Sequence, residues 1–327
     1  MVLRLGNIIL DSPFFQAPLS GYSDYAMRSI SRLFGAPLTF AGVMLAKSAA
    51  HPKILKKPLF RPYDDEHPIG AQILGSDPLI MAKAAKALEE SGYDLIDLNF
   101  ACPAPKVLRR RRGGYLLKHP GKVMEIYRRV RDAVSCPVLM KLRTGFDNSQ
   151  ACRDNFWQIA SQTAAEGIDG LVVHGRSVVQ KFTGKADFQI LAELKRSFPQ
   201  TTIIGSGDLF EADAIAEQLK TTGIDGVVIA RGAIGNPWIF RDLQAIINGR
   251  DKPFEPNLEE QGKIILKHFE LVCQLFDNIK AVRYFRKFLG GYSKRHPERK
   301  KLRQQVLAAE NKSEFIETIN RWYCTSI

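Results

Sequence analysis

The sequence predicts a (β/α)8 TIM barrel followed by a small C-terminal all-α helical domain. Short apolar runs, typical of buried parallel strands, alternate with longer helical patterns from the N-terminus to about residue 250. Eight such runs in that length match a closed barrel. A doubly wound open sheet is the alternative, but no Gly-x-Gly-x-x-Gly sequence follows the first expected strand.

The expected strands are short and apolar, and helical stretches separate them. The strands are 14–17, 38–41, 69–73, 95–98, 138–141, 170–174, 202–205 and 226–229. The helices between them include 78–91, 120–133, 153–166, 188–197 and 211–219. Two of these helices have a clear start, because Pro78 and Pro120 stand near the first helical position, where the missing proline N–H is not needed.

A turn-rich segment divides the chain. Residues 249–256 contain Gly249, Pro253 and Pro256, and we expect them to link a barrel domain, 1–248, to a basic helical domain, 257–327. The pattern beyond the linker is helical only. The helices expected there are 258–276, 281–292, 298–310 and 312–323.

The composition is that of an ordinary globular protein. The 327 residues are 45% hydrophobic and 25% charged, and no apolar run is long enough to cross a bilayer. The N-terminus lacks a signal pattern, and the five cysteines lack the paired spacing of metal ligands, which favours free thiols in a reducing compartment. We therefore expect a cytoplasmic monomer with no membrane segment and no metal.

The net charge of +13 predicts a polyanionic partner. Between residues 280 and 303, ten lysines and arginines accompany a single acid, Glu298, whereas a merely solvated face would carry interspersed acids. We therefore expect nucleic acid, with two basic segments contacting its backbone. The expected contacts are Arg109, Arg110, Arg111, Arg112, Arg283, Arg286 and Lys287.

Cys102 stands just past the end of the fourth expected strand. It precedes Pro103 and is followed by Lys106 and the four arginines 109–112. Nearby positive charge stabilises a thiolate, and barrel enzymes carry their chemistry on the loops at the carboxyl ends of strands. The alternative is a small buried cysteine beside a solvated loop, and the local sequence leaves both readings open.

The other strand ends also carry polar or glycine-rich residues. The turns 205–208 and 230–232 favour a phosphorylated ligand, because backbone N–H groups in such loops can approach a phosphate; the alternative is that their glycines only permit tight turns. Lys141 is costly near a barrel axis unless it faces an anion or an electron-accepting group such as a flavin edge, or forms a Schiff base. His174, two residues before Arg176, is expected in the site rather than in the core.

These motifs resemble, in order and spacing, those of the tRNA-dihydrouridine synthase family, and its bacterial B-type branch most of all. The resemblance covers most of the chain. Its most specific block is 97–107, where an asparagine, two further residues and a Cys-Pro pair precede a lysine. The weaker motifs are 17–19, 72–75, 141–145, 173–176, 206–208, 230–232 and 236–240.

The resemblance implies an FMN-dependent oxidoreductase that reduces the C5–C6 bond of particular uridines in tRNA, with NADPH as the reductant. It implies that Cys102 gives a proton to C5 after a hydride reaches C6. It places Asn99, Arg143 and Arg176 near the uracil, makes the barrel the FMN-binding domain and makes the helical domain RNA-binding. The residues implied to hold FMN are Pro18, Leu19, Ser20, Gln72, Lys141, His174, Ser206, Gly207, Asp208, Ala230 and Arg231.

Some positions depart from the family pattern. Ser206 replaces an asparagine and reaches less far, which weakens one expected FMN contact, while Ala101 and Ala230 each add a methyl group where glycine is usual. The four consecutive arginines are more basic than the family pattern and suggest a different choice of RNA.

Three other functions compete with this interpretation. A flavin barrel acting on free pyrimidines would not need the basic helical tail. A non-catalytic RNA-binding paralogue would not need Cys102, Lys141 and His174. The same chemistry on ribosomal RNA is the third, and nothing in the sequence separates it from chemistry on tRNA.

Overall fold

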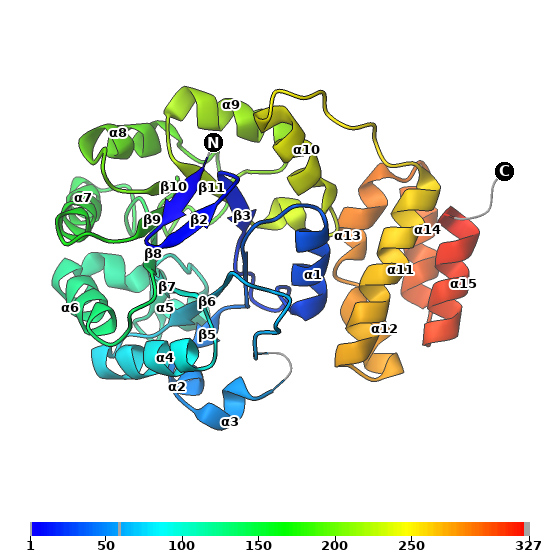
Figure 1. The fold of residues 1–327 in the computed structure, drawn as a ribbon, viewed down its shortest axis with the longest axis horizontal. Coiled ribbons are helices and arrows are strands. Elements are labelled where there is room, and N and C mark those ends of the chain that lie inside the picture. Colours follow the sequence, from blue (N-terminus) through cyan, green and yellow to red (C-terminus); the bar gives the residue numbers. More distant parts are fainter. Residues whose placement is uncertain (1, 58–59, 324–327) are drawn as a thin grey trace.

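The centre of the protein is a nearly closed barrel of parallel strands, seen in a computed structural model that describes residues 2–57 and 60–323 (Figure 1). The strands follow one another in the order β3–β11–β10–β9–β8–β7–β6–β4. Across the remaining edge, the backbone N–H of Gln16 donates to the carbonyl of Leu38 at 3.1 Å. The predicted fold class, a TIM barrel followed along the chain by a group of helices, is confirmed.

The barrel strands coincide with the predicted ones to within two residues at each end. Their bounds are β3 (Phe14–Gln16), β4 (Thr39–Phe40), β6 (Ile69–Leu74), β7 (Leu95–Asn99), β8 (Val138–Arg143), β9 (Gly170–His174), β10 (Ile203–Ser206) and β11 (Gly226–Ile229). A further two-residue strand, β5 (Met44–Leu45), pairs with β6. Almost every strand residue is buried, because helices cover the outside and side chains fill the inside.

Helices pack around this sheet and leave the carboxyl ends of the strands open. In chain order they are α1 (Tyr25–Leu33), α2 (Ala46–Ala49), α3 (Pro52–Leu55), α4 (Pro78–Glu90), α5 (Pro105–Leu108), η1 (Gly113–Lys118), α6 (Pro120–Arg131), α7 (Gln150–Ala165), α8 (Gln189–Ser197), α9 (Ala212–Thr222), η2 (Arg231–Ala233) and α10 (Trp238–Ile247). Helix α4 begins as predicted: Asp77 caps it by accepting from the N–H of Ile80 at 3.0 Å, and Pro78 occupies the first turn.

An unpredicted hairpin closes the other end of the barrel. Strands β1 (Leu3–Leu5) and β2 (Ile8–Leu10) pair antiparallel through a turn at Gly6, whose φ of +59° favours glycine. The buried Leu3, Leu5 and Leu10 join a cluster with residues from the early part of the barrel strands, including Leu95. The hairpin therefore seals the amino ends of the strands and leaves only the opposite end for a ligand.

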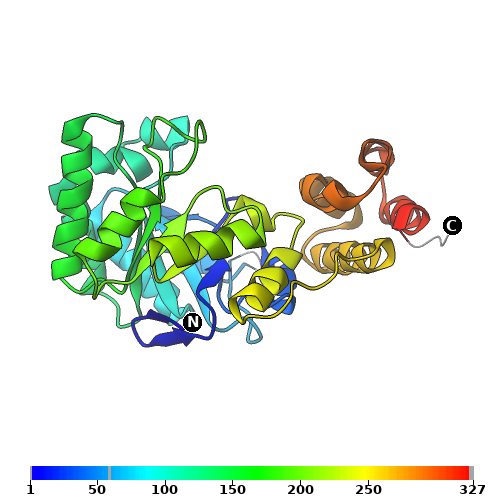
Figure 2. The same cartoon turned by 90° about the horizontal axis from the view of Figure 1, so that it is seen from above.

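The C-terminal helices form a separate group beside α1 and α10 (Figures 1 and 2). They are α11 (Leu258–Leu275), α12 (Asn278–Phe285), α13 (Leu289–Tyr292), η3 (Ser293–Arg295), α14 (Arg299–Ala308) and α15 (Lys312–Tyr323). The single helix predicted over 281–292 is wrong, because the chain turns at 286–288 and starts a new helix. The division at 249–256 stays a prediction, and residues 324–327 of the predicted helical domain lie outside the described residues.

Backbone contacts join α13 to the loop that follows β11. A Cβ on Gly291 would lie 1.8 Å from the carbonyl oxygen of Ile234, and one on Gly235 would lie 2.3 Å from that of Phe288. Two glycines therefore allow the two main chains to touch. A side-chain contact adds to them, since the hydroxyl of Tyr284 on α12 donates to the buried carboxylate of Asp24 beside α1.

Within the described part of the chain, no helix is both long and apolar enough to cross a membrane.

Candidate active site

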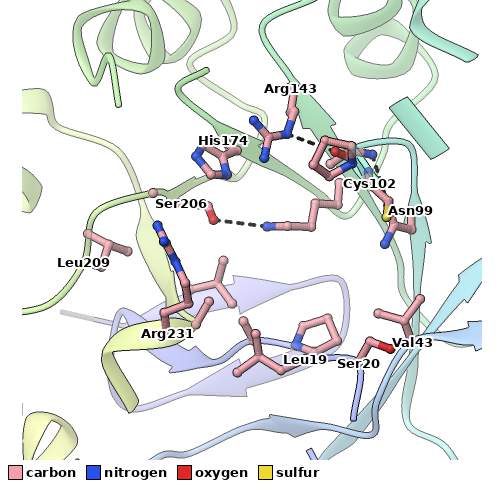
Figure 3. A pocket seen from close by; sticks show the side chains of 18 of the residues that line it. Leu19, Ser20, Val43, Asn99, Cys102, Arg143, His174, Ser206, Leu209 and Arg231 are labelled. Atoms are coloured by element: carbon pink, nitrogen blue, oxygen red, sulfur yellow. Dashed lines mark hydrogen bonds between the residues drawn. The ribbon is translucent and has the colours of Figure 1, made fainter. Parts of the chain in front are cut away.

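A pocket of about 290 Å³ opens at the carboxyl ends of the barrel strands (Figure 3). The predicted catalytic and cofactor residues line it, together with two of the three predicted substrate residues. These lining residues are Pro18, Leu19, Ser20, Gln72, Asn99, Cys102, Lys141, Arg143, His174, Ser206, Gly207, Asp208, Ala230 and Arg231. Cys102 and Asn99 lie on one side of the pocket, and Ser206 and Arg231 lie on the other (Figure 3).

Cys102 is a partly buried free thiol on a tightly packed loop. Its backbone N–H donates to Asn99 Oδ1 at 3.0 Å, and its carbonyl accepts from the N–H of Gly114 at 3.1 Å. Gly113 has a φ of +57°, and a Cβ there would lie 3.0 Å from the Cβ of Cys102. The glycine pair noted in the sequence therefore lets the chain fold back against the cysteine.

Lys141 projects into the pocket from β8. Its Nζ donates to Ser206 Oγ at 3.2 Å, so the serine that replaces the family's asparagine has a partner in the site. Burial lowers the pKa of Lys141 to about 8; the nearby carboxylate of Asp97 opposes this shift, and Arg143 adds to it. The lysine is therefore still cationic at neutral pH, with little margin.

His174 is held as a neutral imidazole. Burial, together with the positive charges of Arg143, Lys141 and Arg176, lowers its pKa to about 2. Its Nε2 lies 3.3 Å from Nη1 of Arg176. Because a guanidinium can only donate, this nitrogen acts as the acceptor and the proton resides on Nδ1.

Arg176 lies behind the pocket rather than in its lining. It is 2% exposed, and its Nη2 donates to Asp208 Oδ2 at 2.5 Å, while Nε donates to the carbonyl of Thr183. Asp208 also lies 3.7 Å from Arg231. Partial burial raises the pKa of Asp208, but these arginines outweigh it and hold the pKa below its ordinary value. Arg176 and Asp208 thus fix the loops after β9 and β10.

Arg143 connects the Cys102 loop to the loop after β9. Its Nε donates to the carbonyl of Ala101, and its Nη1 donates to the carbonyls of Ser177 and Lys181, each at 2.9 Å. No acid is among these partners, and burial lowers its pKa to about 10, with Arg176 contributing. The side chain still lines the pocket, so it combines a structural role with a charge at the site.

Sequence reasoning missed the apolar part of the pocket wall. Val43, Phe182, Leu209 and Phe210 also line the pocket, and the ring of Phe182 lies 4.2 Å from the guanidinium carbon of Arg231. These residues lie in loops beyond the strand ends. An aromatic residue beside a cation in a long loop was the available signal for Phe182.

The predicted RNA-backbone residues differ in how free they are. Arg109, Arg110, Arg111 and Arg283 are exposed, and Arg112 is half-buried. Arg286 donates to the carbonyl of Ala309, and Lys287 donates to that of Gly21 and lies over the ring of Tyr284. The last two therefore hold the helices together and to the barrel. Among the described residues, no cluster of His, Cys, Asp and Glu could hold a metal ion.

The fold and the pocket define a barrel enzyme with a cysteine on one side of its site and glycine-containing turns on the other. A sequence profile described as "Dihydrouridine synthase (Dus)" matches residues 15–326. The chain is 33% identical to tRNA-dihydrouridine synthase B of Pseudomonas putida over 94% of this chain and 90% of that protein. It is 35% identical to tRNA-dihydrouridine synthase B of Pasteurella multocida, over 89% and 86%. The chain belongs to the dihydrouridine synthase family.

Solved structures with the same barrel are more distant in sequence. Morphinone reductase superposes with a TM-score of 0.52 at 14% identity, covering 78% of this chain and 90% of that one. Histamine dehydrogenase from Rhizobium superposes with a TM-score of 0.56, also at 14% identity, over 83% of this chain and 50% of that one. These likenesses bear on the fold only.

Proposed function

We propose that this protein is a tRNA-dihydrouridine synthase, an FMN-dependent oxidoreductase that uses NADPH to reduce the C5–C6 bond of particular uridines in tRNA. The observation that carries the proposal is the meeting of Cys102, Lys141 and Arg231 in one pocket, in a chain of the dihydrouridine synthase family. An enzyme that acts on free pyrimidines would not need the basic helical tail. A protein that only binds RNA would not need the complete set of pocket residues.

The donor set of the pocket fits a flavin mononucleotide. Arg231 lines the pocket together with Gly207 and Gly232, and a guanidinium next to the backbone N–H groups of glycine turns is suited to a phosphate. Lys141 and Gln72 offer a cation and an amide to the ring edge. Residues 17–20 offer a mostly apolar surface to its face.

Bound FMN, with NADPH as its reductant, would supply a hydride to C6 of the uracil, and Lys141, Gln72 and Arg231 would be among the residues that hold it. Cys102 then donates its thiol proton to C5, so that an S–H bond breaks as a C–H bond forms, and water returns a proton to the sulfur. Lys141, cationic at neutral pH, stabilises negative charge at the pocket floor. Asn99 and Arg143 are assigned to the uracil, whereas Arg176 acts on it only through the loop that Asp208 anchors.

A uridine inside a folded tRNA has to leave its stack before it can enter this pocket. We assign Arg109, Arg110 and Arg111 to RNA phosphates beside the extruded nucleotide, because they are exposed and follow the Cys102 loop directly. Arg283, exposed on α12, is a second contact from the helical domain. We further propose that the protein acts as a cytoplasmic monomer and needs no metal.

The experiment that tests the proposal begins with the absorption spectrum of the purified protein, with and without added FMN, and follows the flavin bands anaerobically on addition of NADPH. Bleaching of the bands, followed by dihydrouridine formation in tRNA transcripts, is the expected result. A protein that binds no flavin contradicts the proposal. A reduced flavin that modifies ribosomal RNA but not tRNA contradicts the assignment of substrate.

A further inference from the structure

Three buried polar side chains lie between the interior of the barrel and the Cys102 loop. Asp97 and Asn99 are two residues apart on β7 and therefore share a face of the strand. Gln72 is on the neighbouring strand β6, and the parallel register pairs it directly with Asp97. Gln72, Asp97 and Asn99 are 1%, 2% and 6% exposed. The register of the sheet thus places Gln72 within hydrogen-bonding distance of both Asp97 and Asn99.

Their hydrogen bonds all run in one direction. Gln72 Nε2 donates to Asp97 Oδ2 at 2.6 Å, and Asn99 Nδ2 donates to Gln72 Oε1 at 2.6 Å. The backbone N–H groups of Ala101 and Cys102 donate to Asn99 Oδ1 at 3.1 and 3.0 Å. Each amide both donates and accepts, and the relay ends at a carboxylate that accepts.

The two ends of this relay dictate the orientation of both amides. A backbone N–H can only donate, so Asn99 has to turn its oxygen toward the Cys102 loop and its NH2 group toward Gln72. Gln72 then has to turn its own NH2 group toward residue 97. An ionised carboxylate there can only accept, so it blocks the flipped arrangement, in which an NH2 group would face two N–H groups of the loop.

Packing alone does not account for an acid at this position. The second oxygen of Asp97, Oδ1, is buried without a hydrogen-bond partner, and a buried carboxylate that is only half satisfied is unfavourable. Lys141, whose charge acts on Asp97, is the cation that compensates it. A leucine would fill the same space without this cost, which points to a need for an acceptor.

We propose that Asp97 is a positioning residue that fixes the direction of the Gln72 and Asn99 amides and thereby holds the backbone of Ala101 and Cys102. This role of Asp97 rests on the proposed function in one respect only: the proposed function gives the Cys102 thiol a reaction to perform. Asp97 itself touches no substrate, since it does not line the pocket.

The test compares Asp97→Asn with Asp97→Leu in the full chain, without flavin, NADPH or RNA. Asparagine keeps an acceptor oxygen, whereas leucine keeps the approximate volume and has no acceptor. Hydrogen–deuterium exchange of peptides covering residues 99–104 reports on the two loop N–H groups, with peptides from β9 as the internal reference. We expect Asp97→Leu to speed exchange at Ala101 and Cys102 about ten-fold or more, and Asp97→Asn to stay within about three-fold of the wild type.

The alkylation rate of Cys102 by iodoacetamide, followed by mass spectrometry, should change in the same order. Ile96→Ala is the matched control, because it removes a buried side chain from the opposite face of β7 and should not act selectively on the loop. If Asp97→Leu does not fold, Gln72→Leu cuts the relay at its next member and should have the same selective effect.

Unchanged exchange at Ala101 and Cys102 in the leucine variants would overturn the proposal. So would an Asp97→Asn variant as disturbed as Asp97→Leu, since the charge rather than the acceptor would then be what matters. Neither the exchange nor the alkylation measurement needs turnover. The role of Asp97 can therefore be tested even if the proposed function is wrong, and a negative result for Asp97 does not contradict the proposed function.

Discussion

Cys102 is the residue whose replacement separates chemistry from binding most cleanly. We expect Cys102→Ala to lower the single-turnover rate of dihydrouridine formation by about 10²–10⁴-fold, the usual effect of removing a proton donor, and to leave FMN binding unchanged. Alanine keeps the Cβ against which Gly113 packs, so the loop should persist. Cys273→Ala, at a partly buried free thiol on α11, is the control and should turn over normally. A fully active Cys102→Ala enzyme would exclude the thiol as the acid.

The charge of Lys141 should make FMN affinity depend on pH. Burial lowers its pKa from 10.5 to about 8, so this lysine loses its proton as the pH rises through 8, well before an exposed lysine does. We expect the dissociation constant of FMN, measured by flavin fluorescence, to increase between pH 7 and pH 9. Lys141→Met should bind weakly and with little dependence on pH over this interval. A flat wild-type profile up to pH 9 would mean that the lysine charge does not contribute.

At the residue scale, the sequence predicted which side chains meet but not what they do to each other. Strand ends converge in a barrel, so the positions of Gln72, Lys141 and His174 at strand ends were enough to assign all three to one pocket. The hydrogen bonds of Arg176 to Asp208, and of Gln72 to Asp97, depend on loop paths and on sheet register. Neither the loop paths nor the sheet register can be deduced from one amino-acid sequence.

Helix α1 is tied to the segment before β6 by a buried ion pair. Arg28 Nε donates to Glu66 Oε1 at 2.5 Å, and both side chains are at most 1% exposed. We expect Glu66→Gln to lower the free energy of unfolding in urea by about 3–5 kcal/mol, because it leaves a buried guanidinium without its counter-charge. Glu125→Gln breaks an exposed pair with Lys122 and should change the stability little. Equal effects of the two substitutions would show that Arg28 finds another partner.

At the scale of elements, the strands were predictable because burial on both faces leaves an uninterrupted apolar run. The sequence did not predict the elements whose bounds depend on tertiary contacts. The expected helix over 281–292 breaks at 286–288, although the helical pattern in the sequence continues across the break. Beyond the break, Gly291 lets α13 lie against the backbone of Ile234. The hairpin of β1 and β2 is too short to give a periodic signal, although Gly6 marks its turn.

For the whole molecule, the strongest expectation concerns charge. Replacing Arg109, Arg110 and Arg111 together by glutamine should weaken tRNA binding and lower the slope of log affinity against log salt by about one for each phosphate that is no longer neutralised. The measurement is a salt titration of tRNA binding by filter retention or anisotropy. A triple change at Arg4, Lys83 and Lys86, which are exposed on β1 and α4, removes the same charge elsewhere and is the control. Equal slopes in the two triple variants would mean that only the net charge matters.

The main-chain contact of Gly235 and Gly291 restricts how this protein can be recombined with its relatives. A chimaera cut at the linker would join helices from one parent to a β11 loop from another, and any side chain at either glycine would push the two apart. Segments 231–236 and 288–292 therefore have to come from the same parent, although more than fifty residues separate them in the chain. Engineers who wish to exchange the C-terminal helices would have to transplant both segments together.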